Sequence, residues 1–129
     1  MTPEKILELV NAMTPPELTA MVAEKKGWVW CEEHRYWMTP DNRVIYEECY
    51  SPPTRIDDAI KLLPELSKVF AVDIGPENRD YSLELLRNDG KPCLEGCDCL
   101  PFFFKAWDEL ALAITRAYCW WQMCEKEEC

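Results

Sequence analysis

The fold depends most on the stretch LALAITRAYCWW, residues 110–121. Apolar side chains recur there, and just before it, at the three- and four-residue spacing of one helical face: Trp107, Leu110, Ile114, Ala117 and Trp121. The spacing predicts a long amphipathic helix that begins near Pro101 and packs across a sheet. The chain ends in EKEEC, which puts carboxylates at the negative pole of this helix. We therefore expect residues 122–129 to form a frayed tail.

Two short helices are predicted upstream. Ile6, Val10 and their neighbours recur at helical spacing after Thr2 and Pro3, which are typical of a helix start. Thr14 and Glu17 then form a capping-box pattern for a second helix, which Gly27 ends.

The segment WVWCEEHRYWM, residues 28–38, is rich in aromatic residues and predicts one strand with Trp28 and Trp30 in the core. A turn at residues 40–42 leads to a partner strand at residues 43–46. A third helix is expected over residues 54–69, with a kink or a restart at Pro64 because proline removes a backbone donor.

Three further strands are predicted, over residues 70–74, 81–87 and 93–99, with the turn signal Asn88-Asp89-Gly90 before the last. Helices before, between and after antiparallel strands indicate an α+β class. We therefore expect a single domain over residues 1–129, a layered sandwich of helices around a mainly antiparallel sheet.

Composition narrows the classes of function. The net charge of −10 and the pI near 4.6 disfavour direct nucleic-acid binding and suit a basic protein partner. The N-terminal residues lack the pattern of a signal peptide, and no window predicts a membrane span. These features predict a cytosolic protein whose cysteines are thiols or thiolate ligands.

Four stretches in order resemble the phage ABA sandwich domain family: LTAMVAEKKGWVW, WMTPDNRV, YSPPTRIDDAIKLLPELSKV and ELALAITRAYCW. The resemblance covers roughly residues 5–120. It departs at Asn42, where the family has glycine, at Pro64, and in the cysteine-rich stretches near residues 93–99 and 124–129. The resemblance implies a small phage or prophage protein with a layered α/β fold, located in the host cytoplasm. It implies no activity and no site residues.

Cys93, Cys97 and Cys99 are candidate metal ligands, with Cys31 or His34 as a fourth ligand for a structural zinc. Their spacing differs from that of paired zinc knuckles. A disulfide and unliganded thiols packed beside residues 102–104 are the alternatives.

No catalytic residues are predicted. Glu32 and His34 would share a strand face, but no nucleophile-and-base pattern accompanies them. The four glycines form no phosphate-binding loop. A nucleotide binder would have to use aromatic residues together with Arg35, Arg43 and Arg116.

The candidate partner-binding residues are aromatic and acidic: Trp37, Trp120, Trp121, Glu32 and Glu33. A homodimer seam at Trp120 and Trp121 is the alternative role for those two. The sequence favours a non-enzymatic binding protein, hypothesised to inhibit a host defence protein in the manner of an anti-CRISPR protein. A sponge for a signalling nucleotide and a small metal-binding protein are the alternatives.

Overall fold

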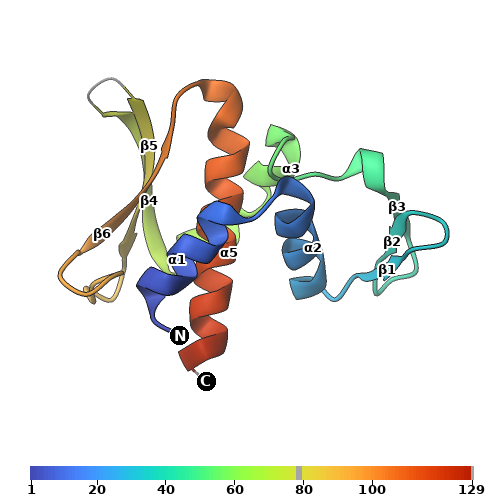
Figure 1. Ribbon diagram of the computed structural model, residues 1–129, viewed down its shortest axis with the longest axis horizontal. Coiled ribbons are helices and arrows are strands. Elements are labelled where there is room, and N and C mark those ends of the chain that lie inside the picture. The colour runs from blue at the N-terminus through green and yellow to red at the C-terminus, as the bar shows by residue number, and fades with distance from the viewer. Residues whose placement is uncertain (78–79, 129) are drawn as a thin grey trace.

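The computed structural model describes residues 1–77 and 80–128. It confirms the α+β class, with antiparallel strands and a long C-terminal helix (Figure 1). The elements in chain order are α1 (Pro3–Ala12), α2 (Pro15–Lys25), β1 (Val29–Cys31), β2 (Tyr36–Met38), β3 (Val44–Tyr46), the 3-10 helix η1 (Glu47–Cys49), α3 (Ile56–Ile60), α4 (Leu63–Ser67), β4 (Phe70–Glu77), β5 (Asp80–Arg87), β6 (Cys99–Phe104), the 3-10 helix η2 (Trp107–Glu109) and α5 (Leu110–Glu128).

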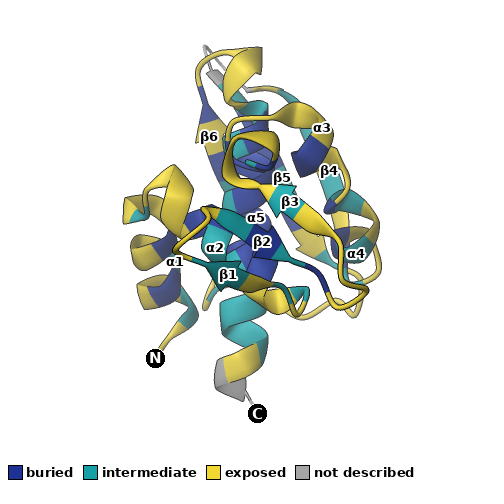
Figure 2. Ribbon diagram, turned by 90° about the vertical axis from the view of Figure 1, so that its right-hand side faces the viewer, coloured by how far each residue is buried: buried dark blue, intermediate teal, exposed yellow. Residues whose placement is uncertain are grey.

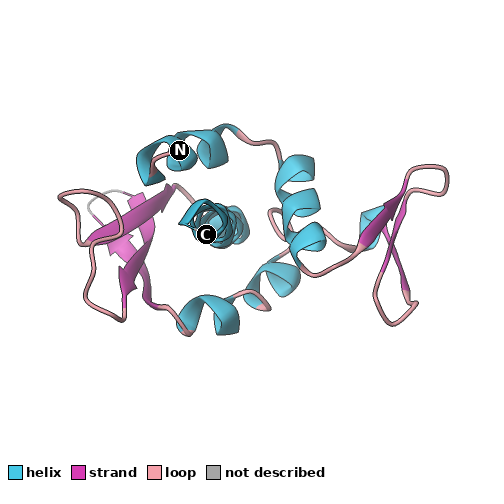
Figure 3. Ribbon diagram, turned by 90° about the horizontal axis from the view of Figure 1, so that it is seen from below, coloured by secondary structure: helices cyan, strands magenta, loops and turns pink. Residues whose placement is uncertain are grey.

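Helix α5 forms the centre of the molecule. Figure 3, which looks along this helix, shows the sheet β4–β6 on one side and α1, α2, α3 and α4 around the others. Small residues such as Ala113 and Ala117 let these neighbours approach closely, and both are almost fully buried. The indole N–H of Trp120 donates to the Pro3 carbonyl oxygen at 3.1 Å and ties α5 to α1. Because α5 has neighbours on all sides, it has no single apolar stripe of the kind predicted.

The predicted frayed tail is helical in the structure as far as Glu128. The Trp121 indole N–H donates to the Glu125 carboxylate at 3.0 Å, and Met123 and Cys124 pack against the core. These contacts extend the helix beyond residue 122, and Cys129 lies outside the described residues.

The sheet β4–β6 packs its inner face on α5. Strand β5 is central and antiparallel to both neighbours, with Leu83 opposite Ile74 and Phe102. The predictions of a strand at residues 93–99 and of a helix from Pro101 are wrong, since β6 begins at Cys99. Phe102 and Phe104 alternate inward while Phe103 is exposed, so the two-residue period of a strand prevails.

The local signals for the first two helices are confirmed. The Thr14 hydroxyl accepts a hydrogen bond from the Glu17 backbone N–H, and the Glu17 carboxylate accepts one from the Thr14 N–H. Gly27 follows α2 with φ of +80°, a conformation that strains other residues. The third predicted helix is divided into α3 and α4, with Pro64 in the first turn of α4.

Residues 28–38 form a tight hairpin rather than one strand. Strand β1 pairs with β2 through Trp30 opposite Trp37, and β2 pairs with β3 through Trp37 opposite Ile45. The reversal occurs at residues 32–35, where Arg35 adopts a left-handed conformation with φ of +59°. These strands form a separate three-stranded sheet, which lies beyond α2 and away from the sheet β4–β6 (Figures 1 and 3).

Candidate functional site

The small sheet β1–β3, with its turn 32–35 and η1, stands out from the body of the molecule, and we call it the β-lobe. Alternation along the paired strands gives it two faces. The inner face carries Trp30, Trp37 and Ile45. The outer face consists of apolar or aromatic residues: Val29, Cys31, Tyr36, Met38, Val44 and Tyr46.

Half of the outer-face residues are exposed, and Cys31, Tyr36 and Met38 are partly buried. Val29 is 67% exposed, Tyr46 is 53% exposed and Val44 is 42% exposed. In Figure 2, which views the molecule from this side, β1 and β3 have intermediate and exposed colours, and buried colour marks part of β2. Tyr36 packs edge-on against Tyr46, with ring centroids 6.0 Å apart, and His34 stacks on Tyr36 at 5.7 Å. The lobe therefore presents a continuous aromatic and aliphatic surface.

One edge of this surface is acidic. The turn 32–35 contributes Glu32 and Glu33, and η1 contributes Glu47 and Glu48 beside Tyr46. Arg35 is the one basic residue among them, so the edge carries a net charge of −3. The pKa of Tyr36 is raised by the Cys31 thiol, by desolvation and by charges that include Glu33, which places that carboxylate near the outer face.

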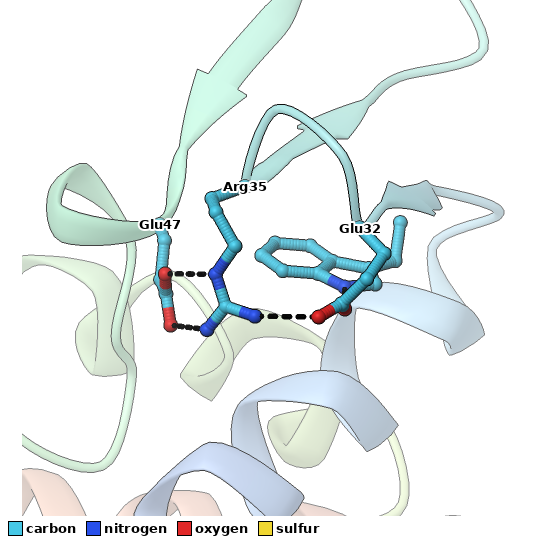
Figure 4. A network of polar contacts seen from close by, with 4 residues as sticks. Glu32, Arg35 and Glu47 are labelled. Atoms are coloured by element: carbon cyan, nitrogen blue, oxygen red, sulfur yellow. Dashed lines mark hydrogen bonds and ion pairs between the residues drawn. The ribbon is translucent and has the colours of Figure 1, made fainter.

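Arg35 is held by two carboxylates from different segments (Figure 4). Its Nε and Nη2 atoms donate to Glu47 at 3.1 and 2.9 Å, and its Nη1 atom donates to Glu32 at 2.8 Å. The guanidinium also lies 5.2 Å from the centroid of the Trp30 ring. The Trp30 indole N–H and the charge of Arg35 hold the pKa of Glu32 below its ordinary value. This network joins the hairpin to η1 and fixes the turn.

A cavity of about 420 Å³ separates the inner face of the lobe from α2. Trp30, Trp37 and Tyr50 form its aromatic wall, and α2 supplies the opposite wall from Pro15 to Glu24. Arg35 and Glu47 lie at its margin. The cavity is thus bordered by rings on one side and by carboxylates at two positions.

The structure separates the predicted partner-binding residues. Glu32 and Glu33 are exposed in the turn of the β-lobe, and Trp37 is buried on its inner face. Trp120 is 2% exposed and packs on Phe70 in the main core. The prediction of an exposed Trp120 is therefore wrong, because α5 lies at the centre of the molecule. Trp121 is half-buried on the same helix. Glu32 and Trp37 therefore share one region that Trp120 and Trp121 do not join.

Glu32 and His34 also differ from the sequence expectation. They lie in the turn rather than on one strand face, and Glu32 is engaged by Trp30 and Arg35.

The predicted metal ligands differ in burial. The Cys93 side chain is buried and its thiol donates to the Leu85 carbonyl oxygen at 3.4 Å, while Cys97 and Cys99 are exposed. Burial raises the pKa of the Cys93 thiol. Across residues 1–77 and 80–128, no group of three or more His, Cys, Asp or Glu side chains is placed to hold a metal ion. The side chains of Cys31, Cys49, Cys93, Cys97, Cys99 and Cys119 are free thiols.

Sequence reasoning missed the outer face of the β-lobe and the exposed Trp107. The outer face was missed because the turn at residues 32–35 contains no glycine, proline or asparagine, so the sequence does not mark it as a turn. Trp107 was expected on the buried side of the last helix. It is 52% exposed in η2, where it packs on Tyr81 at 4.5 Å.

The fold and the β-lobe define an α+β protein with a projecting aromatic sheet and an acidic edge. No protein-family model matches the chain, and comparisons with curated proteins and with solved structures give no match. The resemblance to phage ABA sandwich domains stays a prediction. Within the described residues, no helix combines the length and the apolar character needed to cross a membrane.

Proposed function

We propose that this protein is a non-enzymatic binding protein that docks a basic surface of another protein on the outer face of the β-lobe. The observation that carries the proposal is the uncovered apolar face of β1–β3 beside an edge of net charge −3. Exposed apolar surfaces rimmed by polar residues mark interaction sites more often than chance. Tyrosine is also enriched among the residues that dominate binding energy.

The negative charge of this edge favours a basic partner protein. Glu33 and Glu48 form no ion pair with any residue that the structure describes, and the whole chain has a net charge of −10. A partner with lysine or arginine around an apolar patch would neutralise this edge and would be steered toward it. A second copy of the chain would bring two acidic edges together, which disfavours a homodimer through this face.

The resemblance to phage ABA sandwich domains extends the proposal. We infer that the protein is phage-encoded and inhibits a host defence protein in the host cytoplasm, by covering a basic surface such as a nucleic-acid channel. The alternative of a nucleotide sponge has less support, since Arg35 is held by Glu32 and Glu47 and Arg43 pairs with Asp41 at 2.9 Å. A phosphate would have to displace these carboxylates.

The test is capture of proteins from host lysate by the wild-type chain and by matched variants. Tyr46→Ser should lose the captured protein, whereas Trp107→Ser, which removes an aromatic residue of similar exposure elsewhere, should retain it. Glu33→Lys should reduce the amount of captured protein and make capture less sensitive to salt. Glu8→Lys on α1 should change neither quantity. Equal capture by Tyr46→Ser and Trp107→Ser, or no captured protein at all, would remove the basis of the proposal.

A further inference from the structure

The cavity between the inner face of the β-lobe and α2 is lined by residues of the kind that bind peptides, and we call it the groove. Its aromatic wall includes Trp30 and Trp37, whose ring centroids lie 4.9 Å apart at 54°, and Tyr50 from the segment after η1. Successive turns of α2 form the other wall, which includes Pro15, Thr19 and Ala20. The volume of about 420 Å³ falls in the range of ligand sites in proteins.

Trp37 is the second observation that points to a ligand. Its side chain is only 6% exposed and lines the cavity, yet its indole N–H donates to no residue that the structure describes. The buried indoles of Trp120 and Trp30, in contrast, donate to Pro3 and Glu32. The Trp37 indole N–H is therefore open to a ligand that lies in the groove and supplies an acceptor.

The charge of the groove excludes anionic ligands and favours cationic ones. Glu24 and Glu47 line it, and the Glu24 carboxylate has no ion-pair partner in the part of the chain that the structure describes. Arg35, the basic residue at the margin, is already bound to Glu32 and Glu47. A ligand with a lysine or arginine side chain would find an unengaged carboxylate at Glu24.

We propose that this groove binds a basic, proline-rich segment of a partner protein in the polyproline II conformation. Proline lacks an N–H, so such a segment presents carbonyl acceptors without donors, which matches the unpaired N–H of Trp37. The polyproline II helix has no internal hydrogen bonds, which leaves those carbonyl groups available. Aromatic-lined grooves bind such segments through contact between pyrrolidine and aromatic rings. The flanking lysine or arginine pairs with Glu24.

This site is separate from the outer face of the same sheet, so the two proposals can fail independently. The probe is an oligoproline peptide flanked by arginines, followed by the NMR signal of the Trp37 indole N–H and by tryptophan fluorescence. We expect a saturable shift of the Trp37 signal. Replacing the flanking arginines with glutamates should weaken binding on the order of tenfold, and replacing the prolines with glycine and serine should abolish the shift.

Three variants assign the interaction to the groove. Ala20→Phe fills the cavity from α2 and should abolish binding, whereas Ala12→Phe at the exposed end of α1 should not. Trp37→Phe keeps a ring and removes the donor, and Glu24→Gln removes the free carboxylate, so both should weaken binding at least threefold while the folded NMR spectrum is retained.

Three results would overturn the proposal. The first is the absence of any shift with the arginine-flanked oligoproline. The second is equal binding of the glycine and serine peptide. The third is full binding by a folded Ala20→Phe variant. Tyr46→Ser should leave peptide binding unchanged, because Tyr46 lies on the opposite face of the sheet.

Discussion

The reactivity of Cys119 toward a thiol reagent tests the central packing of α5. The Cys119 side chain is fully buried against α2, where its thiol donates to the Leu18 carbonyl oxygen at 3.8 Å. Burial raises the pKa of this thiol from its ordinary value of 9.0 to about 12. At pH 8 this lowers the thiolate fraction about 1,000-fold, and only the thiolate reacts. Because the reagent must also enter between α2 and α5, the protection should exceed this factor.

The assay is pulsed alkylation with iodoacetamide, followed by acid quenching, digestion and mass spectrometry. In native buffer the exposed cysteines should react first and the two buried ones last; the exposed set is Cys49, Cys97 and Cys99, and the buried pair is Cys93 and Cys119. In denaturant the rates should converge. Modification of Cys119 within tenfold of the rate for Cys49 would refute the reasoning, because α5 would then lack its cover. Protection of both Cys97 and Cys99 would indicate a ligand or a disulfide instead of free thiols.

Two further predictions concern stability. Trp120→Ala should lower the free energy of unfolding by about 3–5 kcal/mol in urea titration, because it removes a buried indole and its hydrogen bond to Pro3, and a loss below about 1 kcal/mol would place Trp120 outside the core. The Arg87 guanidinium and the Lys91 backbone N–H lower the pKa of Asp89 to about 2, so its contribution to folding is present above the ordinary value of 3.8 and is lost as the pH falls toward 2. Asp89→Asn should therefore flatten the dependence of stability on pH between about 4 and 2 and leave it unchanged at higher pH; parallel curves for variant and wild type would contradict this.

The features that could be predicted from the sequence are those encoded by adjacent residues. The capping box of Thr14 and Glu17 and the turn at Asp89 and Gly90 require only local hydrogen bonds, and both are present. Pro64 lacks an N–H, so it interrupts the helix regardless of how the rest of the chain packs. Such signals predict the element order and the α+β class.

The start of α5 could not be predicted because a short apolar run fits both periods. Phe102 to Phe104 can continue a helix that starts at Pro101 or complete a strand, and only pairing with β5 decides between them. The hairpin at residues 32–35 was hidden for a related reason. Arg35 adopts the left-handed conformation at the end of that turn. It is held there by hydrogen bonds to Glu47, which lies twelve residues later in the sequence.

The candidate site could be predicted only in part. The sequence identified Glu32, Glu33 and Trp37, which the structure brings to the β-lobe, but it grouped them with Trp120 and Trp121. That grouping assumed one apolar stripe on the last helix. A helix with neighbours on every side can bury tryptophans in several directions, and this arrangement is set by contacts between distant segments.

The physical argument for a role in binding concerns what the β-lobe contributes to folding. Three strands of three residues form a marginal sheet, and the inner face and the Arg35 network supply contacts that hold it in place. The outer face adds little, because Val29 and Tyr46 are more than half exposed. Serine at either position would leave the core around α5 intact. Folding therefore explains little of the apolar character of Val29 and Tyr46, and this is the physical basis of the docking site that we propose.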